Sequence, residues 1–257
     1  MGKKCNRRTT IVSVPYIRLH FVVEGQTEQT FVNNSIKSHL WKYNKGVDVR
    51  CVQTGRRGST RFRGGIVSYR KLKNDLQRWM KQDNNDDSWF TSMIDLYGLN
   101  SISDEFPGYD EALQFNDPYK RVAALEKALY EDVSRDINFC RFIPYIQLHE
   151  FEALLLVDPG KMTVEFPEHS NEVEELAAQV KDYDSPERID DGENTSPSSR
   201  IIALIPQYDG RKPSSGPIIA DKIGLSIIKE RCPHFKKWME DLESLPEPGS
   251  TGAGDLC

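Results

Sequence analysis

The segment that decides the fold reads Tyr16-Ile-Arg-Leu-His-Phe-Val-Val-Glu24-Gly25. It is rich in β-branched and aromatic residues and stops abruptly at its last two residues, which predicts a first strand. Thr27 can cap a helix that has Glu28 in its first turn, because apolar residues recur at helical spacing from Phe31 to Tyr43. The segment therefore predicts a strand–turn–helix unit.

The alternation of strands and helices continues along the chain. Residue patterns predict strands at 47–51, 89–96 and 139–148, and amphipathic helices at 66–80 and from Asn116-Asp117-Pro118 to Val133. After Pro159, helix signals follow one another without clear strands. The pattern predicts an α/β fold with a mostly parallel sheet, helices on both of its faces and a C-terminal helical extension. Ligands of such sheets bind at the carboxyl ends of the strands.

The same change of pattern divides the chain. Residues 1–160 are expected to form the α/β domain that carries the candidate site, and residues 161–245 a helical extension packed on it. Residues 246–257 are rich in Pro, Gly and Ser, a composition that predicts a disordered tail. The tryptophans fall on apolar faces and are assigned to the core, at positions Trp41, Trp79, Trp89 and Trp238.

Composition places the chain among globular proteins. It has 257 residues, of which 34 are Lys or Arg and 39 are Asp or Glu, so the formal net charge is −5. A hydrophobic content of 38% excludes collagen-like and wholly disordered chains. Apolar runs fall far short of the roughly 18 residues that a membrane span needs. The start is basic, but the apolar segment after it is interrupted by Ser13, Pro15, Arg18 and His20, unlike a signal peptide. We expect a cytoplasmic protein without membrane contact.

Acidic residues follow three of the expected strands. Glu24 ends the first, Asp95 ends the third, and Glu150 and Glu152 follow the fourth. Because the carboxyl ends of parallel strands share one edge of the sheet, these acids and Glu28 are expected to gather there. Carboxylates are the protein ligands that Mg²⁺ or Mn²⁺ prefers. The pattern predicts a metal site formed by these five residues.

Local effects offer a second explanation for some of these residues. Helix N-termini stabilise acids, which would account for Glu28 or Glu150 taken alone. If a helix starts after the fourth strand, Glu150 and Glu152 diverge and only one of them reaches the metal. His149 neighbours both and could assist proton transfer, although a structural hydrogen bond is the commoner role of a single histidine.

Three motifs follow one another in a characteristic order. They are Val23-Glu24-Gly25-x-Thr27-Glu28-x-x-Phe31, Ile94-Asp95-Leu-Tyr97-Gly98, and Pro144-Tyr145-x-x-x-His149-Glu150-Phe151-Glu152-Ala153-Leu154-Leu155. Thr195-Ser-Pro197, Gly216 and Cys232-Pro-His-Phe235-x-x-Trp238 complete the pattern. Together they resemble the AriB-like Toprim family, whose best-understood members are nuclease effectors of PARIS anti-phage defence. The resemblance runs from about Arg18 to Leu242.

The resemblance implies a Toprim-like Rossmannoid fold and an activity. The protein would be a metal-dependent endoribonuclease that cleaves tRNA as a toxic effector. An AAA-type or ABC-type ATPase subunit, similar to AriA, would hold it inactive until a phage trigger, and it would be a homodimer when active. Glu24, Asp95 and Glu28 would be the catalytic residues, with Glu24 as metal ligand or general acid and base.

One position departs from the family pattern. Tyr97 stands where the second acid of an Asp-x-Asp pair is usual, so the number of bound metal ions stays open and Tyr97 becomes a candidate assisting residue. The departure also gives force to an alternative, a non-cleaving regulatory or adaptor subunit of an ATPase complex. A Toprim nuclease that acts on DNA is a further alternative.

Basic residues are concentrated between Arg50 and Lys73, a stretch with eight positive residues and no acid. In a chain of net charge −5, such segregation predicts contact with a phosphate backbone. A flexible solvated loop, or docking on an acidic ATPase surface, explains the same run. The predicted nucleic-acid-binding residues are Arg56, Arg57, Arg61 and Arg63, with Arg211 and Lys212 as a further phosphate contact for which surface charge is the simpler explanation.

Overall fold

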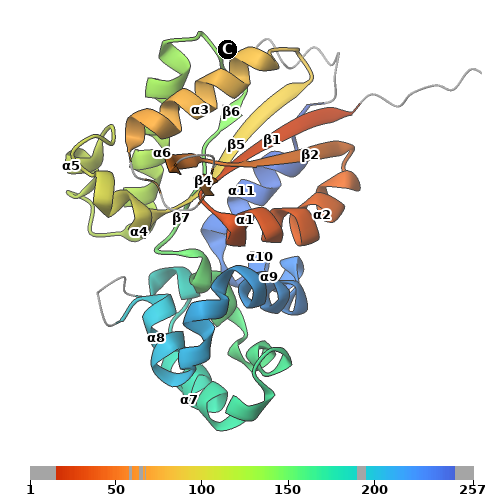
Figure 1. Ribbon diagram of the computed structural model, residues 1–257, viewed down its shortest axis with the longest axis vertical. Coiled ribbons are helices and arrows are strands. Elements are labelled where there is room, and N and C mark those ends of the chain that lie inside the picture. Colours follow the sequence, from red (N-terminus) through yellow and green to blue (C-terminus); the bar gives the residue numbers. More distant parts are fainter. Residues whose placement is uncertain (1–15, 58–59, 64–65, 67, 190–194, 247–257) are drawn as a thin grey trace, which may run out of the picture.

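A computed structural model describes residues 16–57, 60–63, 66, 68–189 and 195–246. The predicted disordered tail lies outside the described residues, except for residue 246. The centre of the protein is a parallel sheet with the strand order β2-β1-β5-β6, in which β7 also pairs with β5 (Figure 1). Its strands are β1 (Ile17–Val23), β2 (Lys45–Cys51), β5 (Ser88–Asp95), β6 (Phe142–Ile143) and β7 (Ile146–Gln147). The predicted α/β fold with a parallel sheet is confirmed.

Helices cover both faces of this sheet. On one face, Val22, Phe90 and Ile94 pack with α3 (Tyr69–Gln82) and α6 (Pro118–Arg135). The other face packs with α1 (Gln26–Phe31), α2 (Lys37–Trp41) and α11 (Pro233–Glu243). The last helix of the chain therefore returns to the sheet, where the Trp238 indole donates a hydrogen bond of 2.8 Å to Thr91 Oγ1.

The remaining elements connect these layers. An antiparallel hairpin of β3 (Gln53–Arg57) and β4 (Thr60–Arg63) follows β2, and short helices α4 (Leu96–Leu99) and α5 (Tyr109–Ala112) follow β5. The C-terminal half adds α7 (Ser170–Val180), α8 (Pro197–Leu204), α9 (Lys212–Ile223) and α10 (Leu225–Arg231). Figure 1 shows α7, α8 and α9 gathered below the sheet.

The first helix begins earlier than the sequence predicts. Gly25, not Thr27, is the N-cap, and the Gly25 amide donates a hydrogen bond of 2.8 Å to the Glu28 carboxylate. A π-helical turn, Val32–Ile36, then separates α1 from α2. Because a π turn adds residues to the helical repeat, side chains after it lie on other faces than regular spacing predicts. Trp41 is 65% exposed, so its assignment to the core is wrong.

The fourth strand is shorter than expected. Instead of one strand over 139–148, β6 and β7 are separated by Pro144 and Tyr145. Proline has no N–H group to donate to a neighbouring strand. The Ser92 hydroxyl accepts a hydrogen bond from the Tyr145 amide at 3.0 Å and donates one to the Tyr145 carbonyl at 3.1 Å. A side chain of β5 thus holds the interrupted strand in place.

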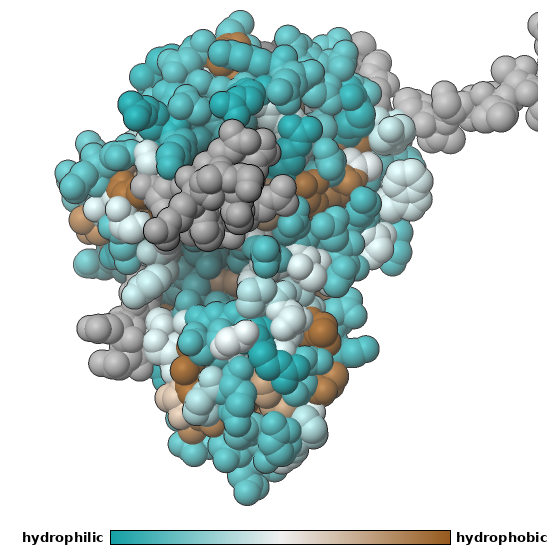
Figure 2. All heavy atoms as spheres, in the orientation of Figure 1, coloured by the Kyte–Doolittle hydropathy of each residue, from teal (hydrophilic) through white to brown (hydrophobic). Residues whose placement is uncertain are grey.

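The lengths and polarity of the described helices bear on whether the chain could span a membrane. Among the described residues, every helix is too short or too polar to cross a bilayer. Figure 2 shows hydrophilic residues over most of the visible face, with the hydrophobic ones scattered in small groups.

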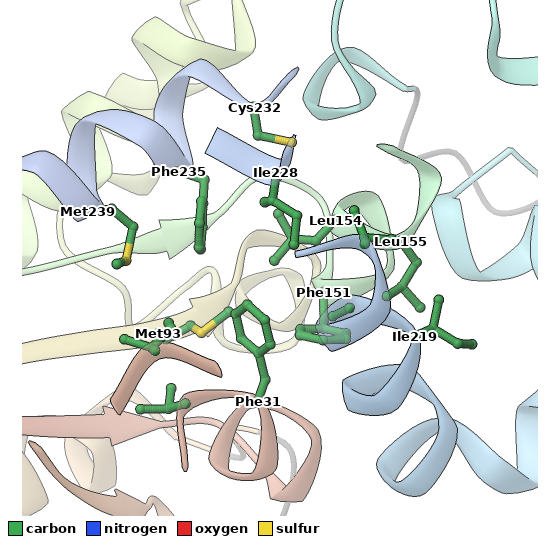
Figure 3. Packing of buried hydrophobic residues seen from close by; sticks show 14 of the residues in the cluster. Phe31, Met93, Phe151, Leu154, Leu155, Ile219, Ile228, Cys232, Phe235 and Met239 are labelled. Atoms are coloured by element: carbon green, nitrogen blue, oxygen red, sulfur yellow. The ribbon is translucent and has the colours of Figure 1, made fainter. Parts of the chain in front are cut away.

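A continuous hydrophobic core joins the sheet to the C-terminal half. Phe31 and Met93 pack with Phe151 and Phe235, and the cluster continues to Ile219 (Figure 3). The ring centroids of Phe31 and Phe151 are 5.4 Å apart in an edge-to-face arrangement, a favourable geometry for aromatic pairs. The division of the chain at residue 160 stays a prediction. The shared core fixes the C-terminal half against the edge of the sheet that carries the acids.

Candidate active site

The acids lie at the carboxyl ends of three neighbouring strands. Glu24 follows β1, Asp95 ends β5, and Glu150 follows β7 after Leu148 and His149. The Glu24 amide donates to the Met93 carbonyl at 3.1 Å, which extends the pairing of β1 with β5 to the site itself. The expected gathering of these strand ends is therefore present in the structure.

Glu24 is held by the backbone of the neighbouring strand. Its carboxylate accepts a hydrogen bond of 3.0 Å from the Asp95 amide. Burial raises the pKa of Glu24, and the hydrogen bonds from the backbones of Asp95 and Ile66 oppose that shift. A Cβ atom placed on Gly98 would lie 2.9 Å from each carboxylate oxygen of Glu24. Gly98 therefore leaves the space in which this carboxylate lies.

Gly98→Ala is expected to displace the Glu24 carboxylate and to reduce any activity of the site. The introduced methyl group overpacks the site, and the shifts that it forces lower the stability of the fold by about 1–3 kcal/mol. The thermal unfolding midpoint of the variant measures this cost. Gly210→Ala is the matched control, because a Cβ at Gly210 meets nothing within 4 Å. Equal midpoints and equal activities for the two variants would contradict the close contact.

Glu28 is a buried acid next to Glu24. Its side chain is only 5% exposed, and the Gly25 amide orients its carboxylate. Burial, followed by the charge of Glu24, raises the pKa of Glu28 to about 8. A carboxyl group with such a pKa can hold or release a proton near neutral pH, as acid–base chemistry requires.

Asp95 is a third acid of the group whose pKa is raised. Burial, and then the charges of Glu28 and Glu24, raise its pKa well above the usual range. Its Oδ1 atom is buried and has no hydrogen-bond partner among the described residues. An unsatisfied buried oxygen costs free energy, so its presence calls for a proton or another ligand.

Glu150 and Glu152 diverge, as the start of a helix after the fourth strand predicted. Glu150 accepts hydrogen bonds from the amide and the hydroxyl of Ser198, at 2.6 and 2.8 Å, and so fixes the first turn of α8. Glu152 accepts a bond of 3.1 Å from the Tyr208 hydroxyl. Burial, followed by the charge of Glu150, raises the pKa of Glu152 to about 7. Glu150 thus accepts two hydrogen bonds from Ser198, whereas Glu152 accepts one from Tyr208.

The carboxylate oxygens of this group are of the chemical type that binds divalent cations. Among the described residues, no group of three or more His, Cys, Asp or Glu side chains is arranged to hold a metal ion. The acids nevertheless repel one another, and the unpartnered Asp95 Oδ1 is a hard oxygen donor of the kind that Mg²⁺ binds. To bind one ion together, the carboxylates of Glu24, Glu28 and Asp95 would have to turn toward a common point, with Glu152 beside them.

His149 and Tyr97 connect the strand ends. His149 adopts a positive φ of 62°, and its carbonyl accepts a hydrogen bond of 2.8 Å from the Tyr97 amide. The His149 ring Nε2 lies 3.0 Å from the Glu187 carbonyl oxygen. The Tyr97 side chain is 45% exposed. His149 thus makes structural hydrogen bonds at the site, and an assisting role for either residue stays a prediction.

The predicted basic residues lie in two places. Arg56 and Arg57 are on β3, and Arg61 and Arg63 are on β4, with Arg56 paired opposite Arg61. The side chains of this hairpin lie outside the described part of the structure, so their contact with phosphate stays a prediction.

Arg211 and Lys212 face acids of their own chain. The Arg211 guanidinium lies 2.8 Å from a Glu165 carboxylate oxygen and stacks over the Phe166 ring, with its Cζ atom 4.9 Å from the ring centroid. The Lys212 ammonium is 4.0 Å from Glu152 Oε1. Lys212 therefore balances part of the charge of the acidic group.

The sequence analysis did not identify three residues that contact the acids of the site. Gly98 lies in a recognised motif, yet only the fold shows that it faces Glu24. Ser198 and Tyr208 reach the site from 48 and 56 residues away in sequence, a separation that no local pattern reveals.

Fold and site together define a Rossmannoid α/β protein with a buried acidic cluster at the carboxyl edge of a parallel sheet. The chain belongs to the family described as domain of unknown function DUF4276, which matches residues 23–243. Comparison with curated proteins and with solved structures gave no match.

Proposed function

We propose that this protein is a metal-dependent Toprim nuclease that cleaves RNA, with tRNA as its substrate. The observation that carries the proposal is the group of acids Glu24, Glu28, Asp95 and Glu152, whose pKa values burial raises, around the unpartnered Asp95 Oδ1. Perturbed acids in the place where α/β proteins bind ligands are typical of catalytic sites. An ordinary structural site would have replaced or paired them.

Each acid has a part in the proposed reaction. A bound Mg²⁺ or Mn²⁺ ion would supply positive charge that offsets the charge of the scissile phosphate. Glu24 and Asp95 would bind this ion, and the Asp95 amide and Gly98 keep the Glu24 carboxylate in position. Glu28, oriented by the Gly25 amide, would take up or release the proton that phosphodiester cleavage transfers.

The biological role in the proposal rests on the motif resemblance. It supports a cytoplasmic toxic effector of anti-phage defence that an ATPase subunit holds inactive until a trigger, and that works as a homodimer. The arginine-bearing hairpin β3–β4 starts two residues after the end of β2 and would give the tRNA a basic surface.

A non-cleaving adaptor is the second candidate function. The observation that favours it is Tyr97, which is exposed where the resembling family carries a second acid. Without that acid the site has less negative charge with which to bind a second metal ion. In this case the acids would contribute to binding of the ATPase and would not cleave a substrate.

The deciding experiment compares the protein with its Glu24→Gln variant, which keeps the size of the side chain. Both are expressed in cells, and the small RNAs are sequenced for new ends. Discrete tRNA breaks that disappear in the variant are expected. Broken DNA with intact tRNA would transfer the proposal to DNA. The absence of any cleavage, with and without the ATPase and a chosen trigger, would favour the adaptor.

A further inference from the structure

A polar cavity is lined in part by the first turn of α1, the helix that carries Glu28. Its volume is about 460 Å³, which is within the range of pockets that bind small ligands. It opens between the end of β2, helix α3 and the first turn of α1. The residues of its wall that matter here are Gln29, Arg50, Cys51, Arg78, Trp79 and Gln82.

One turn of backbone separates this cavity from the acids. Gln29 follows Glu28 directly in α1, so the two side chains leave the same turn toward different sides. The Cys51 thiol, at the end of β2, donates to the Gly25 carbonyl at 3.3 Å, while the Gly25 amide donates to Glu28. The cavity and the acidic group therefore share the backbone of the turn from Gly25 to Gln29.

Arg50 is pre-oriented in the wall. Its guanidinium stacks on the Trp79 indole, with Cζ 3.8 Å from the ring centroid, and Nη1 donates to Gln82 Oε1 at 3.3 Å. Trp79 itself is only 3% exposed, so the indole is a fixed support. A stacked guanidinium keeps its donors in a plane, and this geometry matches phosphate oxygens. The Asp48 carboxylate is 4.0 Å away and 63% exposed, so it screens Arg50 weakly.

Arg78 supplies a second positive charge. Its side chain is 62% exposed, and its contact with Asp75 is long, at 3.4 Å. Exposed pairs of this kind contribute little stability, so the Arg78 guanidinium can turn to a ligand at small cost. The cavity wall thus holds two guanidinium groups against the single carboxylate of Asp75.

We propose that this cavity binds a backbone phosphate of a single-stranded nucleic acid, next to the phosphate that lies at the acidic group. The inference rests on the proposed function and deepens it. A group of carboxylates repels a phosphodiester strand, so a nuclease of this kind needs positive charge close by to hold the strand in place. Arg50 and Arg78 provide that charge on the side of the turn that faces away from Glu28.

The test measures binding without cleavage. The Glu24→Gln variant is titrated with a short fluorescein-labelled single-stranded oligoribonucleotide at several salt concentrations. Adding Arg78→Ala is expected to weaken binding about tenfold and to reduce the slope of log K against log salt by about 0.7, the contribution of one phosphate contact in a single strand. Arg50→Lys, which keeps the charge and loses the stacking, is expected to weaken binding with a smaller change of slope.

The matched control is Lys81→Ala, which removes an exposed positive charge from the same helix outside the cavity. Equal affinities and slopes for Arg78→Ala and Lys81→Ala would overturn the inference, as would the absence of binding by the parent variant. Inorganic phosphate and AMP serve as competitors. If either displaces the oligonucleotide at concentrations similar to those of the unlabelled strand, the cavity binds a small free phosphate compound and the inference fails.

The two proposals fail separately. Glu24-dependent cleavage with no special effect of Arg78 would preserve the nuclease and remove the phosphate site. Binding that depends on Arg78, in a protein that never cleaves, would preserve the phosphate site and remove the nuclease. Circular dichroism of each variant checks that the fold is intact.

Discussion

Asp95→Asn is expected to abolish cleavage and, in protein freed of divalent cations, to increase stability. Asparagine keeps the size of the side chain and removes the charge that Glu28 and Glu24 oppose. Its amide group can also donate a hydrogen bond inside the acidic group. Relief of a buried unsatisfied oxygen is worth about 1–3 kcal/mol, which corresponds to a rise of roughly 2–10 °C in the unfolding midpoint. Loss of a group that stabilises charge in the reaction costs about 100-fold or more in rate.

Two measurements check this expectation, thermal unfolding in the presence of a chelator and cleavage of RNA with Mg²⁺. Asp104→Asn is the control, because Asp104 is an exposed acid outside the site. The same pair of measurements separates the two roles of Asp95. A variant that is less stable than the parent protein and still cleaves RNA would mean that Asp95 is an ordinary structural acid.

A substitution that raises stability and abolishes activity indicates that the original residue is needed for function and not for folding. A fold gains nothing from placing Glu24, Glu28 and Asp95 together in a region of low dielectric, because each charge raises the cost of ionising the others. The parent protein should accordingly gain stability when Mg²⁺ binds, by RT ln(1 + [Mg²⁺]/Kd), while the asparagine variant gains less.

The parts of the fold that depend on neighbours in sequence were predictable. Helix α6 begins where Asp117 and Pro118 indicate, and the Asp117 carboxylate accepts a hydrogen bond of 2.9 Å from the Tyr119 amide. The strands β1 and β5 follow from their β-branched and aromatic residues. Since both are parallel neighbours, the meeting of Glu24 with Asp95 could also be foreseen.

Other features depend on partners far away in sequence or on changes of helical repeat. Trp41 is exposed beside the buried Leu40, because one large apolar residue does not show which face of a short helix it occupies. Glu150 was expected to bind metal, whereas in the fold both of its carboxylate oxygens accept hydrogen bonds from Ser198. Likewise, Arg78 and Trp79 form the cavity wall with Arg50 only because α3 packs over the end of β2.

Glu28→Gln is expected to remove much of the pH dependence of stability in protein without divalent cations. The folded pKa of Glu28 is about 8, above the ordinary value of 4.5, so the folded state keeps a proton that the unfolded state releases. The contribution of Glu28 to stability is therefore complete below about pH 4.5 and is lost as the pH rises through 8. Across this window the parent protein should lose roughly 3–5 kcal/mol through this residue.

Glutamine cannot ionise, and its carbonyl oxygen can still accept the hydrogen bond from the Gly25 amide. We therefore expect the variant to match the parent protein near pH 5 and to exceed it in urea unfolding above pH 8, while Glu152, with a pKa of about 7, still titrates in both. Glu111→Gln, at an exposed position of α5, is the control and should follow the parent protein. Parallel curves for Glu28→Gln and the parent protein would show that Glu28 ionises as it does in solvent. Mg²⁺ added above pH 8 should stabilise the parent protein more than Glu28→Gln, because the variant has one carboxylate fewer to attract the ion.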